Sequence, residues 1–264
     1  MGLLLNRRRM MMGRGDEVIM TSASNPEVMA ICYAQGWCAS ADKMTKTEAE
    51  AVTNIGTVFR NSNIVHFEEF EYFTGLTEVY DRAFQYTRSL ASIAFPKQIT
   101  RIGVYAFNNS TVNFSTLPRD LTTIADNSFN GCGNLTLSTL PSGLTSLGTN
   151  AFYVCLKLQV AEIPTGVSVI PVNCFANCTT IPRMHLHAGV TAIQNQGLNR
   201  LNQMAVLRCD ATTAPTLGTD VFTNCGTRVP AADRKLIVPV GSTGYDTGDW
   251  LYLQNTLGYT LIYE

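Results

Sequence analysis

Charge is scarce in this chain. Asp, Glu, Lys and Arg make up 15% of its 264 residues, and the formal net charge at pH 7 is −1. Such a composition provides no electrostatic attraction to nucleic acid or to an anionic membrane. Long apolar runs are lacking as well, because no segment reaches the roughly 18 residues that a membrane-spanning helix needs. We therefore expect no nucleic-acid partner and no membrane span.

The first residues lack the order of a secretion signal. Their leucine run at positions 3–5 precedes the arginines at positions 7–9 and is cut off by them. A signal peptide has the opposite order, with basic residues followed by about 7–15 apolar ones. We therefore expect that no ordinary cleaved signal exports this protein.

Groups that carry catalysis or bind metals are also few. The only histidines are His66, His185 and His187, and no C-x-x-C pair occurs. His185 and His187 would share one face of a strand, but no third metal ligand is apparent. No glycine-rich phosphate loop is present either. The sequence therefore predicts no cofactor, no metal site and no enzymatic activity.

What the chain does have is a repeat of 22–24 residues. Each repeat contains a phenylalanine, with leucine at one position, and four repeats carry a cysteine three residues later. Stacked repeats place equivalent residues in columns, so we expect the four cysteines to be buried free thiols. The aligned positions are Phe84, Phe107, Phe129, Phe152, Phe175, Leu198 and Phe222, and the cysteines are Cys132, Cys155, Cys178 and Cys225.

Within each repeat, a short extended segment ends just before a proline, as at Pro96, Pro118, Pro141 and Pro164. Proline has no N–H to donate and suits the exit of a strand. An apolar pair spaced i, i+3 follows, which predicts turns or short 3₁₀ segments. One repeat cannot bury its apolar side alone, so the repeats are expected to stack with parallel strands along one face. The fold class is an α/β repeat solenoid.

The repeat consensus L-x-x-I-x-x-P-x-x-[LV]-T-x-I-x-x-x-[AS]-F-x-x-C resembles the BspA-like leucine-rich repeat, the bacterial-surface-antigen type. The resemblance covers about residues 64–240. It weakens where His187 replaces proline and Leu198 replaces phenylalanine, and we expect a looser coil there. Proteins that resemble this repeat are commonly surface-displayed adhesins that engage host macromolecules.

The segments outside the repeats are expected to cap the solenoid. Asn25 and Pro26 open a short helix that stops at Gly36, and a capping box at Thr45 and Glu48 opens a second one. The second helix is expected to run to about Asn54. We divide the chain into an arm (1–24), a helical N-terminal cap (25–63), a solenoid (64–235) and a C-terminal cap (236–264).

The arm carries triplets of leucine, arginine and methionine with no amphipathic pattern. One interpretation is a disordered arm. Our hypothesis is an anchoring peptide that docks the protein, expected to be oligomeric, to other proteins of a larger assembly, because methionines adapt to partner grooves. The residues are Leu3, Leu4, Leu5, Arg7, Arg8, Arg9, Met10, Met11 and Met12.

The candidate binding face consists of residues two and four positions before the proline of each repeat, which strand alternation would turn outward. Several are apolar, so either a partner covers them or a bend in the strand turns them into the core. The candidates are Phe114, Leu137, Val160, Glu162, Arg183, His185 and Arg208.

The missing leader favours a non-enzymatic structural or fibre protein of a phage particle that uses the solenoid for attachment or assembly, located in the virion. The alternative is a bacterial cell-surface adhesin that binds host macromolecules, such as a receptor or a glycan. An enzyme ranks third. Fold analogy alone supports the first two.

Overall fold

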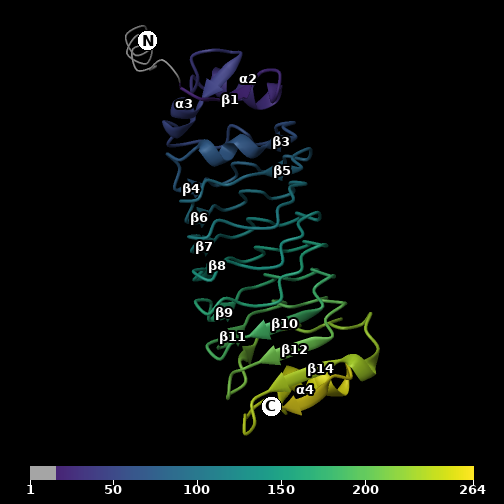
Figure 1. Cartoon of the computed structure of the whole chain (residues 1–264). Helices are drawn as coiled ribbons and strands as arrows, with labels where there is room; N and C mark the ends of the chain where they lie inside the picture. Colours follow the sequence, from purple (N-terminus) through teal and green to yellow (C-terminus); the bar gives the residue numbers. More distant parts are fainter. Residues whose placement is uncertain (1–15) are drawn as a thin grey trace.

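The computed structural model describes residues 16–264. The chain winds into an elongated stack of about nine coils, in which the N-terminal and C-terminal elements occupy opposite ends (Figure 1). Parallel strands pair between successive coils, and helix is confined to short segments. The expected solenoid is therefore confirmed.

One side of the stack is formed by two-residue strands that follow the proline position of each coil. They pair in parallel in two sheets, in the orders β4-β6-β7-β8 and β13-β11-β9. The second residue of each apolar i, i+3 pair, such as Ile102 or Ile124, lies in one of these strands, where a turn or a 3₁₀ segment was expected. The strands are β4 (Glu78–Val79), β6 (Arg101–Ile102), β7 (Thr123–Ile124), β8 (Ser146–Leu147), β9 (Val169–Ile170), β11 (Ala192–Ile193) and β13 (Thr216–Leu217).

A second side is formed by the segments that precede the proline position, where strands were expected. They pair at both ends of the stack, as β3-β5 and as β10-β12-β14-β15. In the coils between, the equivalent segments (113–117, 135–140 and 158–163) contain no strand and only the isolated bridge residue Glu162. The strands thus occupy two sides, because stacked coils bring equivalent backbone groups together wherever the chain is extended. They are β3 (His66–Phe67), β5 (Ser92–Ile93), β10 (Arg183–Leu186), β12 (Val206–Cys209), β14 (Lys235–Val238) and β15 (Thr260–Tyr263).

The third side, which we call the turn side, buries the phenylalanine column. The rings stack with centroids 5.1–5.5 Å apart and planes within 7–12° of parallel, from Phe59 to Phe175. Each buried ring contributes roughly 1.5–3 kcal/mol. Phe59 extends the column by one coil beyond the predicted repeats. Hereafter each coil is named by the residue it places in this column.

The cysteine column is confirmed. Cys132, Cys155, Cys178 and Cys225 are fully buried, and all eight cysteines are free. Their thiols donate to backbone carbonyls of the preceding coil, as Cys155 Sγ does to the oxygen of Phe129 at 3.1 Å. Burial raises the pKa of Cys132 to about 12, so this thiol stays protonated and unreactive at neutral pH.

The N-terminal end carries the two predicted helices. Helix α2 (Pro26–Ala34) follows Asn25, whose side chain donates to the carbonyl of His66 at 2.9 Å instead of capping its own helix. Helix α3 (Lys46–Glu50) has the predicted capping box of Thr45 and Glu48.

Two features of this end differ from expectation. Helix α3 ends at Glu50 and not near Asn54. Strand β1 (Val18–Thr21) lies within the expected arm but pairs antiparallel with β2 (Lys43–Thr45), so the N-terminal unit begins before residue 25. A 3₁₀ helix, η1 (Glu68–Tyr72), completes this end.

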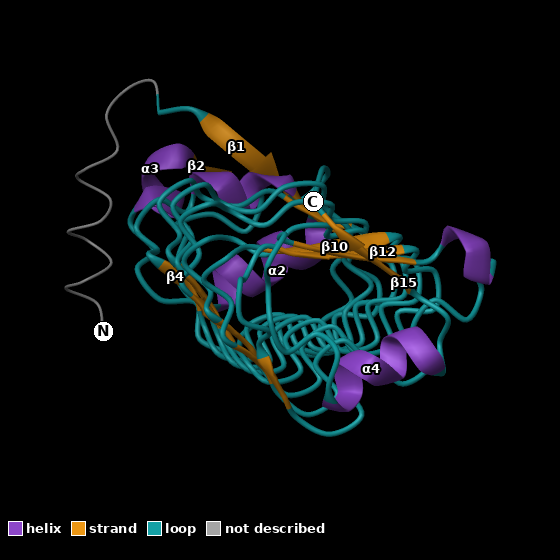
Figure 2. Ribbon diagram, turned by 90° about the horizontal axis from the view of Figure 1, so that it is seen from below, coloured by secondary structure: helices purple, strands orange, loops and turns teal. Residues whose placement is uncertain are grey.

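At the C-terminal end, α4 (Gly248–Asn255) lies across the last coil, as the view along the stack shows (Figure 2). Trp250 packs on Phe222, with ring centroids 5.2 Å apart, and donates from Nε1 to the carbonyl of Pro215 at 3.0 Å. The 3₁₀ helix η2 (Ala231–Asp233) precedes β14.

Candidate functional site

The outer surface of the β10-β12-β14-β15 sheet gathers most of the exposed charged residues that the sequence singled out. Its strands alternate between buried and outward side chains, because Met184 and Leu186 point into the core while Arg183 and His185 point outward. Parallel register then aligns the outward residues of neighbouring strands. We call this surface the four-strand face; it consists of Arg183, His185, Val206, Arg208, Lys235, Ile237, Thr260 and Ile262.

One part of the four-strand face is a network of paired charges. Asp210 lies 2.7 Å from His185 Nε2 and accepts from Arg208 Nε at 2.8 Å, and Arg208 also donates to Glu264 at 3.1 Å. Partial burial raises the pKa of Asp210, but the hydrogen bonds from His185 and Arg208 outweigh it and hold this pKa below its usual value. These partly exposed pairs fix side-chain positions and contribute little stability.

The other part carries unpaired positive charge. Register places Arg183, Val206 and Lys235 side by side, and neither cation forms an ion pair within residues 16–264. The half-buried side chains of Ile237 and Ile262 lie in the next row. Two free cations beside apolar side chains suit an acidic protein surface that also has apolar groups.

The structure brings four of the predicted residues together on this surface or its border. Arg183, His185 and Arg208 belong to the four-strand face, and exposed Glu162 bridges to His185 in register. The sequence analysis did not identify Lys235 as part of this face, because Lys235 lies beyond the last recognised repeat. The signal was present in the alternation of Lys235 and Ile237 with the buried residues of β14.

The apolar members of the predicted face lie elsewhere. Leu137 and Val160 are fully buried in the core, and Phe114 is half-buried with its ring 5.2 Å from that of Phe95. Strict alternation fails there because the segment is not a paired strand: next to Leu137, both Ser138 and Thr139 are exposed. Leu137 and Val160 are therefore core residues and not contacts. The predicted arm residues at positions 3–12 lie outside the described residues.

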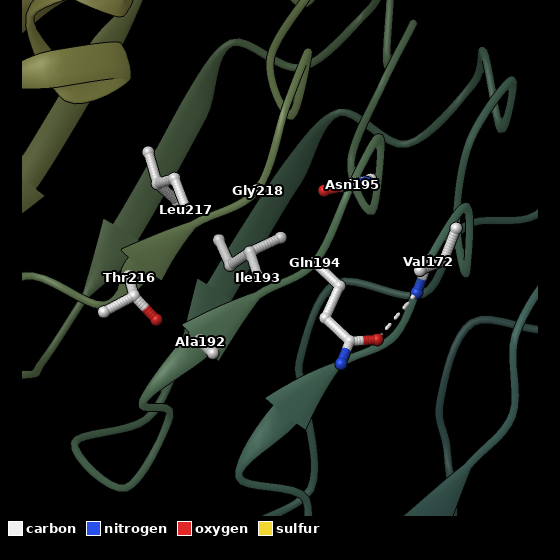
Figure 3. A pocket seen from close by; sticks show the side chains of 8 residues that line it. All are labelled: Val172, Ala192, Ile193, Gln194, Asn195, Thr216, Leu217 and Gly218. Carbon is white, nitrogen blue, oxygen red and sulfur yellow. Dashed lines mark hydrogen bonds between the residues drawn. The ribbon is translucent and has the colours of Figure 1, made fainter.

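A shallow hollow of about 330 Å³ lies against β11 and β13 (Figure 3). Gln194 Oε1 accepts a hydrogen bond there from the backbone N–H of Val172 at 3.2 Å. None of its eight lining residues is ionisable, so the hollow offers no general acid or base. The residues are Val172, Ala192, Ile193, Gln194, Asn195, Thr216, Leu217 and Gly218.

The histidines are engaged in local contacts. His66 Nδ1 lies 3.0 Å from Ser92 Oγ, but the Ser92 hydroxyl donates to Glu68, so the histidine is not placed to accept its proton. His187 Nε2 lies 3.0 Å from the carbonyl of Val167. Among residues 16–264, no three His, Cys, Asp or Glu side chains lie close enough to hold a metal ion. The helices in this part of the chain are all too short to span a bilayer.

The comparison with protein families gives a match over most of the chain. A family model described as the BspA type leucine rich repeat region, in six copies, matches residues 38–114 and 101–228. The matched segments contain the phenylalanine column and the strands of both sides as far as β13, whereas β14 and β15 lie beyond them. A search of the curated proteins finds no match.

Solved structures with some likeness include two bacterial proteins. A leucine-rich repeat protein from Bacteroides ovatus is 18% identical, with 69% of this chain and 63% of that chain covered and a TM-score of 0.36. A leucine-rich cell surface protein from Faecalibacterium prausnitzii is 17% identical, with 75% and 68% covered and a TM-score of 0.32. The chain thus spans less than two thirds of the length of the first.

Proposed function

The chain belongs to the BspA-type leucine-rich repeat family, whose solenoids are protein-interaction modules, and from this we propose that it is a binding module displayed on a bacterial surface. Its contact surface is the four-strand face. Solenoids present extended surfaces of this kind because every coil contributes one row of side chains.

The observation that carries this proposal is the charge of Arg183 and Lys235 on either side of Val206, which no ion pair within residues 16–264 neutralises. Arg208, on the same face, is instead paired with Asp210, which follows β12. An acidic partner would therefore meet two available cations and a fixed network beside them, which favours both specificity and rapid association.

Support for the surface location comes from the repeat family, since the BspA type is the bacterial-surface-antigen type. No comparison supports a phage particle, so the virion stays a prediction, as do the oligomeric state and the anchoring role of positions 3–12. The findings favour the surface adhesin over the phage protein. That an adhesin of this kind would bind a host receptor or a glycan is part of the proposal.

Two measurements test the proposal in bacteria that produce the full chain. Antibody labelling and protease treatment of intact cells should detect the protein outside the cell, and detection only after lysis would refute the surface location. A photo-crosslinking residue at Val206 should trap a protein partner with at least about fivefold higher yield than one at exposed Thr122. Equal yields would refute the four-strand face as the contact.

A further inference from the structure

A cluster of arginine and tyrosine lies on the turn side of the Phe84 and Phe107 coils. The guanidinium carbon of Arg82 lies 5.2 Å from the ring centroid of Tyr105, and that of Arg88 lies 5.8 Å from the ring centroid of Tyr86. Both arginines are exposed and both tyrosines are half-buried. We call these four residues the Arg–Tyr cluster.

Three members of the cluster adopt a left-handed backbone. The φ angles of Arg82, Tyr86 and Tyr105 are 60°, 61° and 57°. Later coils fill the equivalent positions mostly with asparagine or glycine, which tolerate this conformation better. Large side chains here are unfavourable for the backbone, and such costs often accompany functional surfaces.

Arg88 also borders a polar hollow of about 360 Å³ that runs across the next two coils. On its far side, Lys157 Nζ donates to Asn134 Oδ1 at 3.1 Å. The side-chain amides of Asn109 and Asn134 add hydrogen-bonding groups. The lining residues are Arg88, Asn109, Ser110, Thr111, Gly131, Gly133 and Asn134.

The charge of this region is uncompensated. No lining residue is acidic, and within residues 16–264 none of Arg82, Arg88 and Lys157 forms an ion pair. A guanidinium beside side-chain amides is a favourable arrangement for binding a carboxylate, because several N–H groups donate to its two oxygens.

The spacing of the two cations indicates the kind of ligand. Arg88 and Lys157 belong to coils three steps apart, and parallel strands are spaced by about 4.8 Å, so the two lie roughly 15 Å apart along the stack. An extended peptide rises about 3.3 Å per residue, so two carboxylates four residues apart lie on the same face of the peptide and roughly span this distance.

We propose that the Arg–Tyr cluster and the adjoining hollow form a second binding site, which takes an extended acidic segment of a partner protein. One carboxylate of the segment pairs with Arg88, a second pairs with Lys157, and an apolar or aromatic side chain packs on Tyr86. This site lies on the turn side, goes beyond the proposed function and does not depend on the four-strand face.

Fluorescence anisotropy at low ionic strength tests the site with a labelled peptide of about ten residues. The peptide has two glutamates four residues apart in a background of glycine, serine and one tyrosine, and its control has glutamine in place of glutamate. The glutamate peptide should bind at least about fivefold more tightly. Equal affinity of the two peptides would overturn the proposal.

Variants of the full chain locate the binding. Arg88→Gln and Lys157→Gln should each weaken binding at least about fivefold. Arg119→Gln, at an exposed arginine that forms no ion pair with any described residue, should change it less than about twofold. Similar losses in all three variants would indicate attraction by net charge alone and would overturn the site.

A further variant separates binding from folding. Tyr86→Asn introduces a residue that is suited to the left-handed backbone, so it should raise the Tm. The same variant should weaken binding of the glutamate peptide, because it removes the ring on which the peptide packs. Unchanged peptide affinity would show that Tyr86 is not a contact. A uronic-acid oligosaccharide that binds through Arg88 in place of the peptide would show that the ligand class is wrong. Arg183→Glu, which changes the four-strand face, should leave the affinity for the glutamate peptide unchanged. This result is expected whether or not crosslinking at Val206 supports the four-strand face as a contact surface.

Discussion

Two positions in almost every coil adopt a left-handed backbone, two residues before and two residues after the phenylalanine column. Asparagine occupies many of them, as at Asn127 and Asn150, because its short polar side chain tolerates positive φ. Val154 is an exception, with a φ of 59° and a β-branched side chain. Its methyl groups make this conformation especially unfavourable.

Replacing Val154 with asparagine should therefore stabilise the protein. The variant Val154→Asn should gain about 1 kcal/mol, which for a chain of this size raises the Tm by roughly 2–4 °C. Differential scanning calorimetry measures the change. Val104→Asn is a matched control at a half-buried valine whose φ is not positive, and it should not gain stability. A loss of Tm in both variants would show that backbone strain at position 154 is unimportant.

Among the secondary-structure elements, those with strong local signals were predictable. Thr45 with Glu48 correctly indicated the start of α3. The four prolines were a weaker guide, because β5 and the bridge residue Glu162 precede two of them and no strand precedes Pro118 or Pro141. The strands after each proline were not predicted, because two paired residues are too short to show the alternation that identifies a strand. Their apolar spacing of three suggests a turn equally well.

Candidate site residues were likewise predictable only where they lie in a paired strand. Arg183 and His185 alternate with Met184 and Leu186 in a true strand, so their outward direction followed from the pattern. Leu137 lies outside every strand, and there alternation gives no reliable direction.

On the side formed by the strands that follow the proline position, pairing between coils is interrupted once, between β8 and β9. Pro171 accounts for this break. The residue after β6, β7, β11 and β13 donates its N–H to the preceding coil, as Ala125 does to the carbonyl of Ile102 at 3.0 Å. Position 171 follows β9 and has no N–H to donate, so β8 and β9 belong to separate sheets. The break leaves β9 as the edge strand of its sheet, a position in which proline is tolerated.

Replacing Pro171 with alanine should restore the missing contact. In Pro171→Ala, the new N–H at position 171 should donate to the carbonyl of Leu147 and exchange with solvent as slowly as the amide of Ala125. The hydrogen bond contributes about 0.5–1.5 kcal/mol, but the loss of proline's rigidity offsets about 0.4–1 kcal/mol, so the net change in stability is small. Amide exchange measured by NMR decides the matter, and fast exchange at position 171 would contradict this account.

At the scale of the whole molecule, each coil contacts only its neighbours, and the two end coils need covers of their own. We propose that the segment containing α2 and α3 covers the first coil and that α4 covers the last. Trp250 is the centre of the second cover, since it is 3% exposed and packs between Phe222 and Tyr245.

Trp250→Ala should destabilise the C-terminal end by about 3–5 kcal/mol, the usual cost of removing a buried tryptophan. Since the stack transmits stability only between neighbours, the loss should be local. Hydrogen exchange followed by mass spectrometry should speed up in the Phe222 coil and stay unchanged in the Phe107 coil. Leu251→Ala is a control on the same helix, at a side chain 37% exposed, and should have little effect. Uniformly faster exchange in Trp250→Ala would mean that the solenoid unfolds as one cooperative unit and that Trp250 stabilises all of it.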